Sequence, residues 1–201
     1  LPCPNENVTL EEANTYPSIQ LFERTAPGFQ LSESTLTSVI QICNMVEGLP
    51  LGIKLAASWA GTLSPAVIAE RLAPRLELLQ GDEGHSRYES VHATLESSLA
   101  LLSAAERLAL TKLSVFQSDF SLMAAQHVTE VSLPVLRSLI EKSLLRYDQE
   151  NERYSFHALI GQYMYTMLEQ HPDTSQKVKT SHATYYLDRL EQLPNAEGEA
   201  K

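Results

Sequence analysis

The sequence of 201 residues is long enough for one large or two small domains, and its hydrophobic content of 43% is sufficient for packed cores. Its formal net charge of −10 argues against non-specific binding to nucleic acid or to an anionic membrane, since both need a basic surface. No apolar run approaches the roughly 18 residues of a membrane span, no signal peptide is visible, and the only cysteines are Cys3 and Cys43. These features predict a cytoplasmic chain without a disulfide.

The first 80 residues predict a compact helical domain. Residues 1–15 have the composition of a connecting segment, with a short turn near Leu10. Apolar residues at helical spacing then predict helices at about 17–26, 33–47 and 50–61, and another that starts at Pro65. The polar, glycine-containing stretch 81–87 has no periodicity, so it predicts a linker between domains.

The second part of the chain predicts a winged-helix domain over residues 88–172. Helical periodicity covers about 88–102, 103–116, 122–128 and 133–144, and Ser103 with Glu106 forms a capping-box pattern. Two short strand-like segments, 145–148 and 153–156, flank a polar turn, and a helix over about 158–170 follows them. Residues 173–201 predict one more helix, at about 175–193, leading away from this domain. The expected fold is mainly α: a helical bundle domain followed by a winged-helix domain with one small β-hairpin.

Two helical patterns meet at a corner, Gly48-Leu49-Pro50-Leu51, with almost nothing between them. Gly48 suits the left-handed position that ends a helix, and Pro50 suits the first position of the next helix. The second helix therefore begins with free N–H groups and a partial positive charge. The pattern is compatible with an ordinary helix–helix corner and with a binding position.

This corner and other segments resemble the NB-ARC proteins of the STAND class of signal-transduction ATPases, in which a "GLPL" motif precedes a helix rich in small residues. Further segments match the family in order and spacing: Pro17–Arg24, Ile42-Cys43, Leu99–Arg107, Leu113–Phe116, Phe120–Ala125, Leu139–Leu145 and Tyr154–Ile160. The last of these lies where the family carries its "MHD" motif. His157 is retained there, whereas Phe156 replaces the methionine and Ala158 replaces the aspartate.

The resemblance implies a regulatory piece of an ATPase switch, of the type found in bacterial transcription regulators. In the family, the GLPL proline packs against the adenine of ADP or ATP, and the MHD histidine contacts the terminal phosphate of ADP. Gly48, Leu49, Pro50, Leu51 and His157 are thus the implied nucleotide-binding positions. An N-terminal nucleotide-binding domain and a C-terminal sensor domain of the same longer chain are the implied partners. Signal-dependent oligomerisation of that parent is implied as well.

The residues present here do not supply catalysis. No G-x-x-x-x-G-K-[ST] phosphate loop occurs, so we expect no ATPase activity and no bound cofactor in this chain; ADP or ATP with Mg²⁺ would bind only the parent. No two histidines stand at i, i+4 and neither cysteine lies near a histidine, so no metal site is expected.

Two other functions remain open from the sequence. The first is a helical interaction scaffold with an acidic surface and no nucleotide role. The second is a DNA-binding winged helix, although the helix in the recognition position, about 132–144, is largely apolar with only Arg137 and Lys142 as cations. We therefore expect no direct binding to nucleic acid. For His157 the alternative is a helix-start residue that bonds to the nearby backbone.

Overall fold

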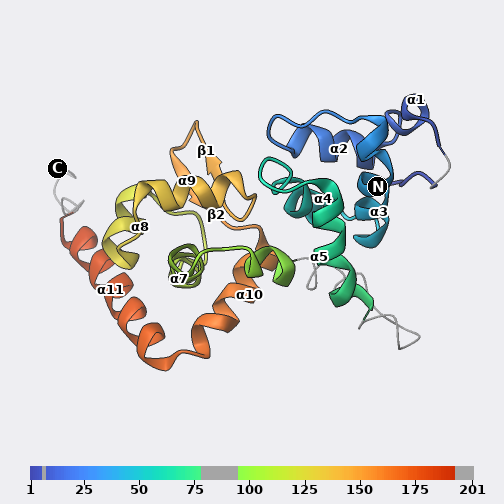
Figure 1. The fold of residues 1–201 in the computed structure, drawn as a ribbon. Helices are drawn as coiled ribbons and strands as arrows, with labels where there is room; N and C mark the ends of the chain where they lie inside the picture. The colour runs from blue at the N-terminus through green and yellow to red at the C-terminus, as the bar shows by residue number, and fades with distance from the viewer. Residues whose placement is uncertain (6–7, 78–94, 193–201) are drawn as a thin grey trace. The chain divides into compact units, whose positions relative to one another are not determined.

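The computed structural model describes residues 1–5, 8–77 and 95–192 and is mainly α-helical with one two-stranded sheet, which confirms the predicted fold class (Figure 1). The chain divides into two compact units. The first comprises residues 1–102 together with 141–143, and the second comprises residues 103–140 and 144–201. The predicted linker at 81–87 lies outside the described residues, as does most of the helix predicted at 88–102, of which residues 95–100 are described as helical.

The first unit is a helical bundle. Its helices are α1 (Leu10–Ala13), α2 (Pro17–Thr25), α3 (Glu33–Met45), α4 (Pro50–Ala57) and α5 (Pro65–Glu77). Helix α3 packs against α5, and α2 packs against α4. The centre is fully buried and built from aromatic and branched side chains, among them Phe22, Ile40 and Ile53. Burial of such side chains stabilises each by roughly 1.5–3 kcal/mol, so this unit has a core of its own.

The N-terminal segment packs onto this bundle, although the sequence predicted a connecting segment. Pro4 is buried, and the Asn44 side-chain amide donates to its carbonyl oxygen at 3.3 Å. Thr9 and Glu12 form a capping box that starts α1. Composition alone did not indicate the contact between Asn44 and Pro4, because it joins residues 40 positions apart in the chain.

The second unit has the element order of a winged helix. Helices α7 (Ala104–Leu113), α8 (Leu122–Thr129) and α9 (Leu133–Glu141) precede an antiparallel hairpin of β1 (Arg146–Asp148) and β2 (Arg153–Ser155). Phe120, predicted in a loop, forms a bridge to Tyr154, with hydrogen bonds of 2.9 and 2.8 Å in the two directions. This segment between α7 and α8 therefore extends the small sheet by one strand position.

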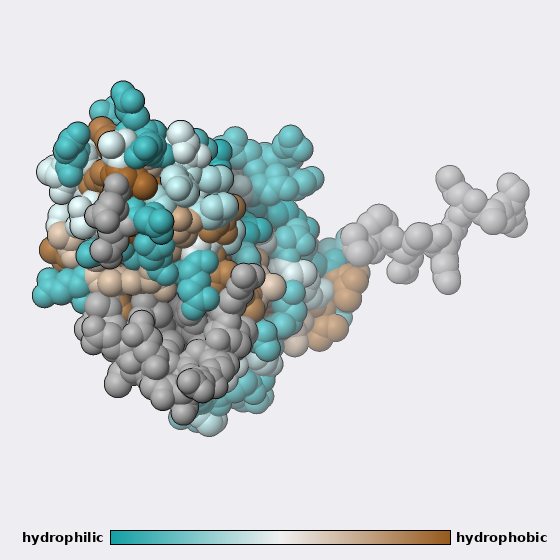
Figure 2. Space-filling view, turned by 90° about the vertical axis from the view of Figure 1, so that its right-hand side faces the viewer, coloured by the Kyte–Doolittle hydropathy of each residue, from teal (hydrophilic) through white to brown (hydrophobic). Residues whose placement is uncertain are grey.

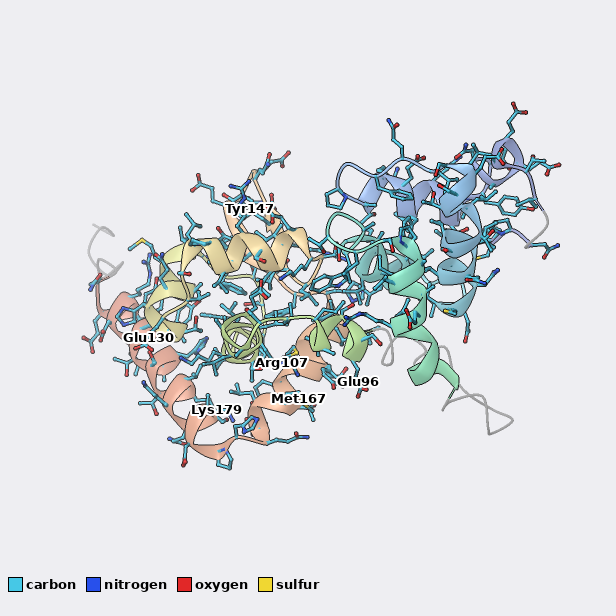
Figure 3. The ribbon with its side chains drawn as sticks, in the orientation of Figure 1. Glu96, Arg107, Glu130, Tyr147, Met167 and Lys179 are labelled. Carbon is cyan, nitrogen blue, oxygen red and sulfur yellow. The ribbon has the colours of Figure 1, made fainter. Side chains whose placement is uncertain are left out.

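Two further helices, α10 (Ala158–Glu169) and α11 (Pro172–Glu191), complete the second unit. Helix α11 packs on α8, and it starts three residues earlier than predicted because Pro172 is accommodated in its first turn. The corner between α10 and α11 is held by Glu169, which accepts from Lys179 and from Ser175, each at 2.7 Å. Lys179 lies on α11, where Figure 3 labels it.

Several helices end earlier than predicted because the backbone turns left-handed or tightens there. Helix α3 stops at Met45 before positive φ angles at Glu47 and Gly48, and α9 stops at Glu141 before a positive φ at Ser143. Helix α4 stops at Ala57, where Ser58 donates its hydroxyl to the Leu55 carbonyl at 2.8 Å. Apolar periodicity continued past these points because the following turns are also buried.

Candidate functional site

The corner between α3 and α4 is a fully hydrogen-bonded helix ending. The Gly48 N–H donates to the Cys43 carbonyl and the Glu47 N–H donates to the Asn44 carbonyl, both at 2.9 Å. This is the bond pattern of a Schellman ending. Gly48 has the left-handed conformation predicted for it, with φ of 65°, and Glu47 shares it with φ of 52°. The sequence did not point to Glu47, since a charged residue rarely adopts this conformation.

Helix α4 begins two residues after this turn, as predicted. Leu49 is its N-cap, without a side-chain capping bond, and Pro50 occupies the first turn. Pro50 is exposed, while Leu49 and Leu51 are half-buried. A Cβ at Gly52 would lie 2.9 Å from the Cβ of Val46, so the start of α4 lies directly against the end of α3. The proline thus stands on the surface of a corner fixed from both sides.

The N-terminal segment covers the Gly48 side of this corner. The Leu1 amino group donates to the Gly48 carbonyl at 2.7 Å, and the Cys3 thiol donates to the Cys43 carbonyl at 3.4 Å. A Cβ on Gly48 would overlap the Leu1 carbonyl oxygen. Gly48 is therefore required both for its positive φ and for the close approach of this segment, while Pro50 remains exposed.

His157 lies in the second unit, between β2 and α10. It is the N-cap of α10, with φ of −68° and ψ of 136°, and its carbonyl accepts from the Gly161 N–H at 3.0 Å. Its half-buried side chain makes no capping bond to the helix. The first turn of α10 contains no acidic residue, because Ala158 stands where the related motif has an aspartate. The side chain of His157 is thus not committed to capping its own helix.

A cavity of about 430 Å³ adjoins the start of α10. Three aromatic residues, several polar residues and one carboxylate line it: Phe116, Phe156, Tyr165, Ser114, Gln117, Ser118, Ser155, Ala158, Gly161, Gln162 and Asp119. None of these side chains is cationic, and Asp119 pairs with Arg153 at 3.3 Å. The lining therefore offers no positive side chain to an anionic group.

The predicted nucleotide-binding residues fall into two groups. The structure brings Gly48, Leu49, Pro50 and Leu51 together on one corner of the first unit, and it puts His157 in the second. Cys3 was not among the predicted site residues, although it touches the corner. The available signal was that Cys3 and Cys43 are the only cysteines of the chain.

Helix α9 occupies the recognition position of the winged-helix order. Its residues Leu136 and Leu139 are fully buried, and the Ser138 hydroxyl donates to Glu106 of α7 at 2.6 Å. Its exposed positions include Leu133, Arg137 and Glu141. The exposed face of α9 thus combines an apolar residue, one cation and one carboxylate. A helix that reads DNA needs several phosphate and base contacts.

Neither a metal cluster nor a membrane span is found in the described part of the chain. Across residues 1–5, 8–77 and 95–192, no three side chains of His, Cys, Asp or Glu gather as metal ligands. Within the same ranges no helix is both long and apolar enough to cross a bilayer. Figure 2 shows a face on which hydrophilic and hydrophobic residues are interspersed.

Comparison with known proteins gives mycobacterial relatives. No protein-family model matches the chain. It is 30% identical over 185 residues to proteins of Mycobacterium tuberculosis and Mycobacterium bovis named "Putative HTH-type transcriptional regulator", covering 84% of this chain and 21% of theirs. It is also 38% identical over 120 residues to an uncharacterised protein of Mycobacterium tuberculosis, covering 57% of this chain and 30% of the relative.

The chain therefore spans less than a third of the length of these relatives. An alignment over 84% of the chain necessarily includes residues of both units, since neither unit alone is that large. The chain is similar to transcription-regulator-like proteins across its helical bundle and its winged-helix-like unit, which supports a regulatory role.

Proposed function

We propose that this chain is a non-catalytic regulatory part of a longer STAND-class switch of the NB-ARC type, in a bacterial transcription regulator. The observation that carries the proposal is the Gly48–Leu51 corner: a rigid, hydrogen-bonded turn that presents an exposed proline at the start of a buried helix. A winged-helix-like unit follows it in the chain, as the resemblance requires. The similarity to longer regulators agrees with a part that acts within a larger chain.

In this proposal the two units close over ADP or ATP held, with Mg²⁺, on a nucleotide-binding domain that precedes them in the parent. Pro50 contacts the adenine, because its exposed ring offers a flat apolar surface without a donor. By the resemblance, His157 contacts the terminal phosphate, since it holds the place of the MHD histidine at the start of α10. A signal received by a C-terminal sensor domain opens this closed state and permits oligomerisation.

The test uses the parent protein loaded with ADP. A hydrogen bond to a charged phosphate contributes roughly 1.5–3 kcal/mol, so His157→Ala should speed ADP release by about one to two orders of magnitude if only the closed state makes the contact. His171→Ala is the matched control, since His171 lies at the far end of α10. Unchanged release in the first variant, with normal folding, would refute the role of His157.

The absence of catalysis is tested separately on the 201-residue chain. The chain contains no phosphate loop, so Mg-ATP turnover should equal the buffer blank in a preparation free of contaminating ATPases. Turnover above that blank, retained through repeated purification, would show that these units carry a catalytic site of their own.

DNA binding is the second candidate, favoured by the name of the relatives and by the hairpin after α9. Against it stand the net charge of −10 and the mixed exposed face of α9. Fluorescence anisotropy with duplex DNA should show only non-specific affinity, roughly 10⁻⁴–10⁻⁶ M at physiological salt. A sequence-dependent nanomolar complex would establish DNA binding instead. If the parent protein bound neither ADP nor ATP, the interaction scaffold without a nucleotide role would be favoured.

A further inference from the structure

The fold brings the two cysteines of the chain together at the α3–α4 corner. The Cys3 thiol donates to the carbonyl oxygen of Cys43 at 3.4 Å, although 40 positions separate them in the sequence. The same carbonyl accepts from the Gly48 N–H at 2.9 Å. The Cys3 sulfur also lies 3.1 Å from the place that a Cβ on Gly48 would take. Cys3 is thus seated on the turn that holds the corner, beside the backbone of Cys43.

The two thiols differ in exposure. Cys43 is fully buried, whereas Cys3 is half-exposed. Burial first, and the nearby Cys3 sulfur to a lesser extent, raise the pKa of the Cys43 thiol to about 12, since two thiolates repel each other. A small oxidant in solution therefore reacts with Cys3 first, because the Cys43 thiol is not accessible to solvent.

We propose that Cys3 and Cys43 form a reversible intramolecular disulfide when the protein meets a peroxide. The Cys3 thiolate attacks one peroxide oxygen and the O–O bond breaks, which leaves a sulfenic acid on Cys3 and releases hydroxide. The hydroxide takes up the proton that the Cys3 thiol had lost and becomes water. The Cys43 sulfur then attacks the Cys3 sulfur, the S–O bond breaks, and the hydroxide leaves with the Cys43 proton as a second water. Two thiols lose two electrons and two protons, and the peroxide is reduced to two water molecules.

The disulfide ties the N-terminal segment across the corner. Three hydrogen bonds hold residues 1–4 there: Leu1 donates to Gly48, Cys3 donates to Cys43, and Asn44 of α3 donates to the Pro4 carbonyl. A disulfide keeps the N-terminal segment bound to the corner until a thiol reductant reduces it. The oxidised chain also has a restricted unfolded state, because the bond closes a loop of about 40 residues, so its melting temperature should rise by roughly 5–15 °C. This inference is independent of nucleotide binding.

The test is oxidation of the 201-residue chain with hydrogen peroxide, followed by unfolding in the presence of an alkylating agent and mass spectrometry. We expect both thiols to escape alkylation, the mass to fall by two hydrogen atoms, and the chain to stay monomeric. Treatment with dithiothreitol should restore two alkylated cysteines. A Cys3→Ser variant should keep one alkylated thiol at Cys43 throughout, and its melting temperature should not respond to peroxide.

The rate of closure gives a second readout. Only the Cys43 thiolate attacks the sulfenic acid, and far below its pKa the thiolate fraction rises tenfold per pH unit. Disulfide formation should therefore accelerate roughly 30-fold from about pH 7 to about pH 8.5. Three results would overturn the proposal: Cys43 still alkylated after Cys3 has become sulfinic acid, a disulfide only between two chains, or the same loss of Cys43 alkylation in Cys3→Ser.

Discussion

Helices α4 and α10 both begin without a side-chain cap, and both carry a residue implied in nucleotide binding, but different forces fix the two starts. At α4, neighbouring residues do so: positive φ angles at Glu47 and Gly48 end α3, and Pro50 opens the next helix. At α10, the start follows a hairpin whose strand β2 is held by Phe120, more than 30 positions earlier in the chain. Pro50 is thus positioned by local backbone geometry, and His157 by tertiary contacts.

The difference indicates where each start is vulnerable. A change at the α3–α4 corner acts on the backbone conformation itself, while a change in the distant aromatic core acts on α10. The sole tryptophan, Trp59, follows α4 in the first unit, so its fluorescence reports on that unit, whereas far-UV circular dichroism reports on both. The two signals together test whether the start of α4 and the start of α10 unfold independently.

The largest effect is expected for Phe120→Ala. Phe120 is fully buried and stacks on Phe116 at 4.4 Å, and its backbone bridges Tyr154. Removing such a ring from a core costs about 3–5 kcal/mol. The urea midpoint by circular dichroism should fall sharply, with a smaller shift in Trp59 fluorescence. Tyr147→Ala is the control, since Tyr147 is 40% exposed on the hairpin that Phe120 joins. Equal shifts of the two urea midpoints would contradict the view that the starts of α4 and α10 are stabilised independently.

An intermediate effect is expected for Gly48→Ala, measured against Gly28→Ala. Both glycines have φ of 65°, so both variants carry the strain of a left-handed side chain, about 1–2 kcal/mol. A Cβ at Gly28 meets nothing within 4 Å, whereas a Cβ at Gly48 overlaps the Leu1 carbonyl. Gly48→Ala should therefore cost about 1–2 kcal/mol more, with Trp59 fluorescence as the sensitive signal. Equal losses of unfolding free energy in the two variants would show that the N-terminal segment moves away from Gly48 without a measurable cost.

A small effect is expected for His157→Ala in the 201-residue chain. The phosphate proposed as the partner of His157 is not part of this chain, and the side chain does not cap α10. Its removal should therefore cost less than the roughly 1 kcal/mol of a lost N-cap. Ser103→Ala is the positive control, because Ser103 accepts from the Glu106 N–H in a capping box at the start of α7. A loss for His157→Ala as large as that for Ser103→Ala would assign His157 to the fold.

The smallest effect concerns acidity. Burial lowers the pKa of His182 below its ordinary value of 6.5, with Phe116 and Tyr186 as ring neighbours at 5.2 and 4.8 Å. The unfolded chain then binds a proton more readily than the folded chain. The contribution of His182 to stability is therefore present above about pH 6.5 and is lost as the pH falls below it. His182→Gln should reduce the difference between urea midpoints at about pH 7.5 and about pH 5.5. An unchanged difference would show that His182 does not contribute to the pH dependence of stability.

Much of the fold could be predicted because local rules specify it. The capping box of Ser103 with Glu106, the prolines at the first turns of α2 and α4, and the polar turn between two short strands all lie within a few residues of the structure they produce. The corner at Gly48 was predictable for the same reason. Whether Pro50 and His157 contact a nucleotide stays a prediction, because the contact depends on the nucleotide-binding domain that we propose for the parent.

The sequence by itself determined the helical character, the hairpin, and the left-handed ending of α3, since backbone sterics and apolar periodicity act over at most a few turns. Only the tertiary structure decided the contacts that join distant residues. It placed Phe120 on Tyr154 as an added strand position, packed residues 1–4 on the corner, and brought Cys3 to Cys43. Such pairings depend on how packed helices bring distant segments together. A pattern within a short window of the sequence does not indicate which distant residues will be in contact.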